Sequence, residues 1–255
     1  MSAAGVNGAR PDIVLLHGWG TTPHVWREVA PLLDRHFRVH APGLPYSGEV
    51  QSHDAGTVEA IAERVAAWAP KACMVCGWSL GGAVALAWAR RAPRQVARLA
   101  LIATNPCFVQ RADWPHGLEA RAVHDFARGL VREPAAVLTR YITLQARGDV
   151  RAARVVRHLR QTLSQRPHQP DATALQLGLT LLLRTDLRSV LPHITQPALL
   201  IHGARDRVVP LAAGEYLAQR LPNGRISLMA NAAHAPFASD PEDACAQLAR
   251  FFDER

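Results

Sequence analysis

The chain has 255 residues, of which 49% are hydrophobic, and a formal net charge of +8. This length accommodates one catalytic domain with a sizeable core, no apolar run is long enough to span a membrane, and the start of the chain lacks the apolar core of a secretory signal. Of the four cysteines, Cys73 and Cys76 form a C-x-x-C pair inside an apolar run, and Cys107 and Cys245 supply no second pair of metal ligands, so we expect reduced, structural cysteines in a cytoplasmic protein. We also expect a monomer that needs no metal or organic cofactor.

The first predicted strand is the short apolar run at residues 13–16, which leads into the loop HGWG at 17–20. The two glycines let this loop turn close to a neighbouring strand end. Such a loop can direct a backbone amide at developing negative charge, and we expect the amide of Trp19 to do so. A second strand is predicted at residues 37–41.

The third apolar run, at residues 72–76, is followed by GWSLG at 77–81 and then by a stretch of small residues with helical character. A G-x-S-x-G sequence between a strand and a helix is the pattern of a nucleophile elbow, in which a strained turn exposes the serine hydroxyl. We therefore predict Ser79 as a nucleophile. The amide of Leu80, at the start of the helix, is expected to be the second donor to developing negative charge.

The next predicted strand covers residues 99–103, and the alternation of strands and helices resumes only after Pro197. Between them, residues 111–188 show no strand pattern. Four stretches have helical character, at 118–131, 134–147, 150–164 and 171–183, with breaks near 133–134, 148 and 166–170. We expect an α/β fold with a mostly parallel sheet flanked by helices, in which residues 1–110 and 189–255 form the core and residues 111–188 form a helical cap over the site.

A serine nucleophile needs a base and a carboxylate that orients the base. An apolar strand and a glycine turn precede Asp206, and another short strand runs into the loop that contains His234. Both residues follow strands, at the edge where ligands bind in open α/β sheets, and the chain order Ser, Asp, His fits the elbow. We predict His234 as the base and Asp206 as the carboxylate, in preference to Asp186 and Asp240, which follow no buried strand.

With these motifs the chain resembles the α/β hydrolases and, among them, the pimeloyl-[acyl-carrier protein] methyl ester esterases of biotin synthesis. The elbow and the HG pair are common to the whole superfamily. The other matching stretches are GWSLGG at 77–82, NPCF at 105–108, DWP at 113–115, LQ at 144–145, TDLR at 185–188 and AAHAPF at 232–237. Of these, GWSLGG, PCF with DWP, and AHAPF are much narrower than the superfamily motifs. The loop GLPYSG at 43–48 departs from the pattern DLPGxG that such enzymes commonly have.

The resemblance implies a serine carboxylesterase that uses no cofactor. It implies hydrolysis of the methyl ester of a pimeloyl chain carried by acyl carrier protein, with release of methanol. It also implies that the acyl chain contacts Trp19, Ser79, Leu80, His234 and the cap stretch YITLQ, which comprises Tyr141, Ile142, Thr143, Leu144 and Gln145.

Most of the excess positive charge lies in the expected cap, where 13 arginines oppose 7 acidic residues, a difference of +6. Helical spacing places Arg147, Arg151 and Arg154 on one face. A basic face beside an esterase site suits an acidic carrier of the substrate, and by the resemblance this carrier is acyl carrier protein. The candidates for docking it are Arg140, Arg151, Arg154, Arg157 and Arg160.

Three alternatives remain open from the sequence. A general short-chain carboxylesterase would have the same triad, with the basic cap incidental to substrate choice. The same fold could also serve a C–C bond hydrolase or a cofactor-free haloperoxidase. A non-catalytic basic binding module is disfavoured by the complete triad and by the lack of basic residues interleaved with stacking aromatics, so we expect neither nucleic acid nor membrane as a partner.

Overall fold

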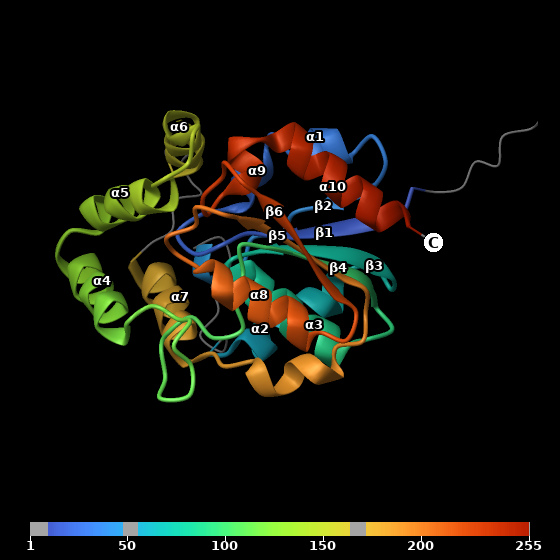
Figure 1. Cartoon of the computed structure of the whole chain (residues 1–255), viewed down its shortest axis with the longest axis horizontal. Coiled ribbons are helices and arrows are strands. Elements are labelled where there is room, and N and C mark those ends of the chain that lie inside the picture. Colours follow the sequence, from blue (N-terminus) through green and yellow to red (C-terminus); the bar gives the residue numbers. More distant parts are fainter. Residues whose placement is uncertain (1–9, 48–55, 164–171, 255) are drawn as a thin grey trace, which may run out of the picture.

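The fold is built on one six-stranded parallel sheet (Figure 1). The computed structural model describes residues 10–47, 56–163 and 172–254. The strand order is β2-β1-β3-β4-β5-β6, and every neighbouring pair is parallel, which confirms the predicted α/β architecture. The strands are β1 Asp12–Leu16, β2 Arg38–His40, β3 Cys73–Trp78, β4 Val96–Ile102, β5 Ala198–Gly203 and β6 Gly224–Met229.

The order of the strands creates a crevice at the middle of the sheet. From β1 the chain crosses to β2 on one side, and it then returns to place β3 on the other side of β1. The chain therefore leaves the carboxyl end of β1 toward one side of the sheet and the carboxyl end of β3 toward the other side. The point between these two strand ends is the switch point where open α/β sheets bind ligands. The HGWG loop follows β1 and the elbow follows β3, so the topology brings them side by side.

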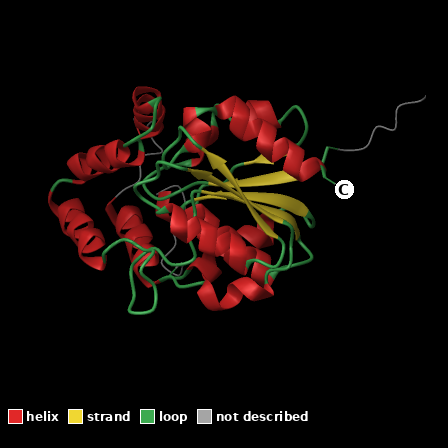
Figure 2. Ribbon diagram, viewed as in Figure 1, coloured by secondary structure: helices red, strands yellow, loops and turns green. Residues whose placement is uncertain are grey.

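Helices cover both faces of the sheet (Figure 2). Because strands buried on both faces must be apolar throughout, β3 and β5 are buried at every residue. Two separate hydrophobic clusters result, one on each face of the sheet. The first face carries α2 Val58–Trp68, α3 Leu80–Arg91 and α8 Leu211–Arg220, and the second carries α1 Ala30–Leu33, α9 Pro236–Ser239 and α10 Pro241–Asp253.

In the described residues between β4 and β5, four α-helices lie close to the bounds expected from the sequence. They lie together beyond one end of the sheet (left in Figure 1). Within the described part of 111–188 no strand forms, although Arg111 and Trp114 make an isolated β-bridge. The break expected at 166–170 lies outside the described residues. The helices are α4 Ala120–Arg132, α5 Pro134–Gln145, α6 Ala152–Leu163 and α7 Ala172–Arg184.

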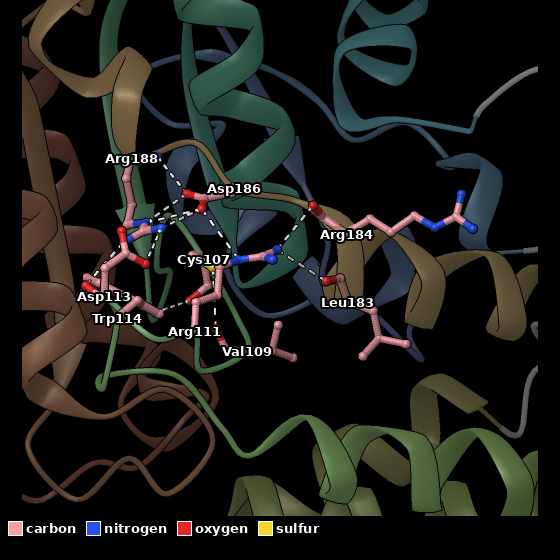
Figure 3. Close-up of polar contacts among 9 residues, drawn as sticks. All are labelled: Cys107, Val109, Arg111, Asp113, Trp114, Leu183, Arg184, Asp186 and Arg188. Carbon is pink, nitrogen blue, oxygen red and sulfur yellow. Dashed lines mark hydrogen bonds and ion pairs between the residues drawn. The ribbon is translucent and has the colours of Figure 1, made fainter.

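An ion-pair network joins the two ends of this helical segment (Figure 3). Arg188 binds Asp186 through Nε and Nη2, at 2.9 and 2.7 Å, and its Nη1 lies 3.0 Å from an oxygen of Asp113. The Arg111 guanidinium reaches Asp186 from the other side at 3.4 Å and donates to the sulfur of Cys107 at 3.3 Å. The network therefore links the residues just before the first helix of this segment to the residues just after its last helix.

Three short 3₁₀ helices complete the described elements, at η1 Pro23–Trp26, η2 Pro45–Ser47 and η3 Arg188–His193. No helix in the described ranges is both long and apolar enough to cross a membrane. The cysteines are all unpaired and buried, and Cys73 and Cys76 pack within β3. Burial raises the pKa of the Cys73 thiol to about 12, so this C-x-x-C pair has the character of structural, protonated cysteines.

Candidate active site

Ser79 occupies the turn between β3 and α3 in a strained conformation. Its φ of 54° lies in the left-handed region that side chains other than glycine rarely adopt. Two glycines make this turn possible, since a Cβ on Gly77 would lie 2.4 Å from the carbonyl oxygen of Gly81 and a Cβ on Gly81 would lie 2.3 Å from that of Leu16. The sequence therefore folds here into the sharp strand–turn–helix expected of a nucleophile elbow.

The structure brings Ser79, His234 and Asp206 together although they lie far apart in the chain. Nε2 of His234 is 3.1 Å from Oγ of Ser79, and Nδ1 of His234 is 2.8 Å from Oδ2 of Asp206. The three residues follow β3, β6 and β5, respectively, so they meet at the carboxyl edge of the sheet. His234 is fully buried and the other two are below 10% exposed. The arrangement has the hydrogen-bond order of a hydrolytic triad.

The Asp206 carboxylate is held by the backbone that follows it. Its Oδ1 accepts from the amides of Val208 and Val209 at 2.7 and 2.9 Å, which leaves Oδ2 directed at the imidazole. The two competing carboxylates are engaged elsewhere, since Asp186 binds Arg188 and Asp240 binds Arg151. Among these three carboxylates, Asp206 is therefore the one that lies within hydrogen-bond distance of His234.

The two expected amide donors lie beside Ser79. Leu80 is the first residue of α3, and the first amides of a helix have no partner within that helix. The HGWG loop approaches from the other side, because a Cβ on Gly18 would lie 3.3 Å from Cβ of Ser79. The Trp19 amide comes next in the chain after Gly18, and its role with the Leu80 amide as an oxyanion donor stays a prediction.

His17 braces this loop as a neutral imidazole. Its Nε2 accepts from the amide of Leu44 at 3.2 Å, and its Nδ1 lies 3.0 Å from the carbonyl oxygen of Gly18. Burial lowers the pKa of His17 to about 4, although the hydrogen bond to Gly18 acts in the opposite direction. Tyr46 adds a bond from its hydroxyl to the carbonyl of His17 at 2.8 Å. Two residues of the unusual loop at 43–48, Leu44 and Tyr46, therefore support the HGWG loop, while Gly48 lies outside the described residues.

The side chain of Trp19 forms a wall between the sheet and the helical segment. Its Nε1 donates to the carbonyl of Leu175 in α7 at 2.9 Å. Its ring meets that of Tyr141 edge to face, with centroids 4.7 Å apart. Burial, together with the nearby charge of Asp206, raises the pKa of the Tyr141 phenol above its ordinary value. Trp19 and Tyr141 therefore bring helices α7 and α5 against the triad.

The remaining four residues of the YITLQ stretch lie on different faces of α5. Leu144 packs against the same cluster as Tyr141, and the carbonyl of Gln145 accepts from the amide of His234 at 3.1 Å. Thr143 is exposed and its hydroxyl donates to the carbonyl of Thr139. Ile142 packs in the other hydrophobic cluster. The expectation that the acyl chain contacts all five side chains therefore needs correction for Ile142 and Thr143, which face away from the Tyr141 side of α5.

A narrow pocket opens beside Ser79 on the side of β4. Asn105 lies at its wall, is 8% exposed, and its Nδ2 has no partner among the described residues. A buried amide without a partner is costly, so this group is available to a bound molecule. We did not predict Asn105 from its chemistry, although it opens the NPCF motif and follows β4 at the same sheet edge. The lining residues are Ser79, Leu80, Ala83, Asn105, Pro106, Phe108, Leu182 and Thr185.

Two of the expected docking arginines are bound to the core. Arg151 lies 2.8 Å from a carboxylate oxygen of Asp240. Arg154 pairs with Glu28 and donates from Nε to the carbonyl of Ala238 at 3.1 Å. Arg154 is only one-third exposed, because tertiary contacts direct this part of α6 toward η1 and α9. The docking role of both arginines stays a prediction.

The other candidates face outward. Arg140 in α5 and Arg157 and Arg160 in α6 are exposed, and none forms an ion pair with any residue that the structure describes. Their positive charges are therefore not neutralised by the described part of the chain. Nor do the described ranges contain a group of three or more His, Cys, Asp or Glu side chains placed to hold a metal ion.

Comparison with known proteins agrees with this geometry. The family described as the alpha/beta hydrolase fold matches residues 11–241. The pimeloyl-[acyl-carrier protein] methyl ester esterase of Aromatoleum aromaticum is 47% identical over 244 residues, which cover 94% of this chain and 96% of that protein. The protein of the same name from Nitrosomonas europaea is 41% identical, with coverage of 92% and 93%.

The chain belongs to the pimeloyl-[acyl-carrier protein] methyl ester esterase family of α/β hydrolases. The resemblance inferred from GWSLGG, NPCF and AAHAPF is thereby confirmed. Solved structures support the α/β hydrolase fold. An esterase from Exiguobacterium antarcticum superposes with a TM-score of 0.85 at 20% identity, covering 97% of this chain and 93% of the other. The enol-lactonase from Burkholderia xenovorans gives 0.82 at 22% identity, with coverage of 98% and 94%.

Proposed function

We propose that this esterase hydrolyses the methyl ester at the end of a pimeloyl chain carried by acyl carrier protein, a step of biotin synthesis, and that Ser79, His234 and Asp206 carry out the reaction. The observation that carries this proposal is the continuous hydrogen-bonded series from Asp206 through His234 to the strained Ser79. Family membership supports the choice of substrate.

In the acylation step, Oγ of Ser79 attacks the ester carbonyl while Nε2 of His234 takes its proton. Asp206 keeps the imidazole in the tautomer that can accept this proton and stabilises the cation that forms. The negative charge on the carbonyl oxygen rests on the amides of Leu80 and Trp19, each worth roughly 3 kcal/mol in such sites. His234 then gives its proton to the departing methoxide, so methanol leaves and an acyl-serine remains.

In the deacylation step, His234 takes a proton from a water molecule that attacks the acyl-serine. The tetrahedral species collapses, Oγ of Ser79 regains the proton, and the free carboxyl group leaves on its chain. Trp19 and Tyr141 form one wall of the space above the serine, and the Asn105 pocket lies beside it. These walls are expected to hold the chain while the carrier stays outside.

The carrier is expected to dock on the exposed arginines of the helical segment. Arg140, Arg157 and Arg160 provide uncompensated positive charge next to the site. Complementary charge raises the rate of association with an acidic carrier and orients it. Arg151 and Arg154, which are held by core acids, contribute mainly to the attachment of α6.

The test compares two substrates, pimeloyl-acyl-carrier-protein methyl ester and free pimelate dimethyl ester. We expect the double variant R157E/R160E to lose about tenfold or more in kcat/KM on the carrier-bound ester and to act normally on the free ester. The matched control is R35E/R94E, which makes the same change of charge at exposed positions of the core. Equal losses in both double variants would contradict local docking on these arginines, and a preference of the wild type for the free ester would indicate a general carboxylesterase.

A further inference from the structure

The loop that carries His234 is fastened to the turn between α5 and α6. We define the histidine loop as residues 230–235 and the α5–α6 turn as residues 146–151. Arg205 spans both, since it donates to the carbonyl of Ala230 at 3.3 Å and to that of Gly148 at 3.1 Å. Direct bonds run from the amide of His234 to the carbonyl of Gln145 and from the amide of Val150 to the carbonyl of Asn231, both at 3.1 Å.

Asp149 lies at the centre of this contact. It is 7% exposed, and its Oδ2 accepts from the amide of Ala233 at 2.9 Å. Its Oδ1 accepts from the hydroxyl of Ser239 at 2.8 Å and from the amide of Arg151 at 2.7 Å. Bonds from amides to an ionised carboxylate are stronger than those between neutral groups. One buried carboxylate therefore joins the α5–α6 turn, the histidine loop and the short helix α9.

These contacts fix the backbone on both sides of the imidazole. The carbonyl of His234 accepts from Nε1 of Trp78 at 2.8 Å, and its amide is held by Gln145. Asp149 holds the peptide one step earlier, between Ala232 and Ala233, through the amide of Ala233. A displacement of about 1 Å in a catalytic group can cost a hundredfold in rate, so the position of this peptide matters for the distance from Nε2 to Ser79.

We propose that Asp149 is a positioning residue for His234. Through Asp149, the α5–α6 turn fixes the distance from Nε2 of His234 to Oγ of Ser79. This inference rests on the proposed role of His234. It also means that the helical segment is part of the catalytic framework in addition to covering the site.

Two substitutions separate the roles of the carboxylate. Asp149→Ala removes every bond and leaves the Ala233 amide buried without an acceptor. Asp149→Asn keeps one oxygen, which can still accept from Ala233 if the new NH₂ group faces Ser239, whose hydroxyl can act as an acceptor. In that orientation the amide of Arg151 loses its acceptor, so D149N removes the bond to Arg151 and keeps the bond to Ala233. Ser239→Ala is the matched control, because it removes one bond to the opposite oxygen and leaves the Ala233 bond intact.

The full-length variants are assayed on p-nitrophenyl acetate, with thermal unfolding and the rate of Ser79 labelling by a fluorophosphonate measured in parallel. We expect D149A to lose about 10- to 100-fold in kcat and in labelling rate, with KM within about threefold of wild type. D149N and S239A are expected to stay within about fivefold in kcat. Wild-type kcat in folded D149A would overturn the proposal, as would D149N falling as far as D149A. If D149A does not fold, a loss in D149N as large as 10- to 100-fold overturns it.

Ser79→Ala distinguishes this inference from the function on which it depends. Hydrolysis by S79A at the wild-type rate would contradict the role of Ser79 as nucleophile and hence the proposed function. An inactive S79A together with a fully active D149A would contradict only the role of Asp149.

Discussion

Low pH should reduce the unfolding free energy of the protein through one residue of the HGWG loop, His17. The folded protein lowers the pKa of His17 from 6.5 to about 4 because the ring is buried, and its Nε2 must stay unprotonated to accept from Leu44. The unfolded chain therefore binds this proton more readily. Stability from His17 is complete above pH 6.5 and is lost as the pH falls toward 4. The difference between the two pKa values, at about 1.4 kcal/mol per pH unit, corresponds to about 3 kcal/mol of unfolding free energy.

The assay is urea denaturation at intervals from pH 7 to pH 4, for the wild type and for His17→Gln. Glutamine can accept from Leu44 and donate to Gly18 without titrating. Between pH 7 and pH 4, the unfolding free energy of the His17→Gln variant should therefore fall by about 3 kcal/mol less than that of the wild type. Burial also lowers the pKa values of His158 and His202, but these residues are present in both proteins and cancel in the comparison. Parallel curves for the two proteins would refute the reasoning.

Three further predictions concern the elbow, the ion-pair network around Arg188 and the pocket beside Ser79. Gly81→Ala should lower stability by roughly 1–3 kcal/mol in chemical denaturation, because its Cβ would lie 2.3 Å from a backbone oxygen; an unchanged midpoint would contradict this. Arg188→Lys keeps the charge but loses the two-pronged bond to Asp186, so we expect the unfolding free energy in chemical denaturation to fall by about 1 kcal/mol, whereas Arg94→Lys should leave it unchanged. Asn105→Ala should reduce kcat/KM on the methyl ester by about three- to tenfold at unchanged melting temperature, and full activity would show that its amide does not contact substrate.

The backbone plan of the site could be predicted because local signals mark it. The elbow, the glycine turn before Asp206 and the loop of His234 each follow an apolar strand, and parallel strands end at one edge. The break at 133–134 also fell where α4 gives way to α5, since proline is favoured at the start of a helix. The limits of the strands differ from the apolar runs, since β4 begins at Val96, three residues before the predicted start at 99.

The orientation of side chains on the helical segment could not be read from the sequence. Successive helical residues turn by about 100°, so five consecutive residues such as YITLQ cannot all face one site, and the structure turns Thr143 outward. Ion pairs posed the same problem, because the partners of Arg151 and Arg154 lie far away in the chain. Asp149 gave no signal at all, because its partner Ala233 is 84 residues distant.

The most direct test of the central claim is the mass of the carrier-bound acyl chain after incubation of pimeloyl-acyl-carrier-protein methyl ester with the wild type and with Ser79→Ala. The account predicts that the wild type converts the ester to the free acid, with the mass of one methylene lost and methanol released, while the thioester to the carrier stays intact and S79A leaves the ester unchanged. Cleavage at the thioester, or conversion by S79A at the wild-type rate, would contradict it.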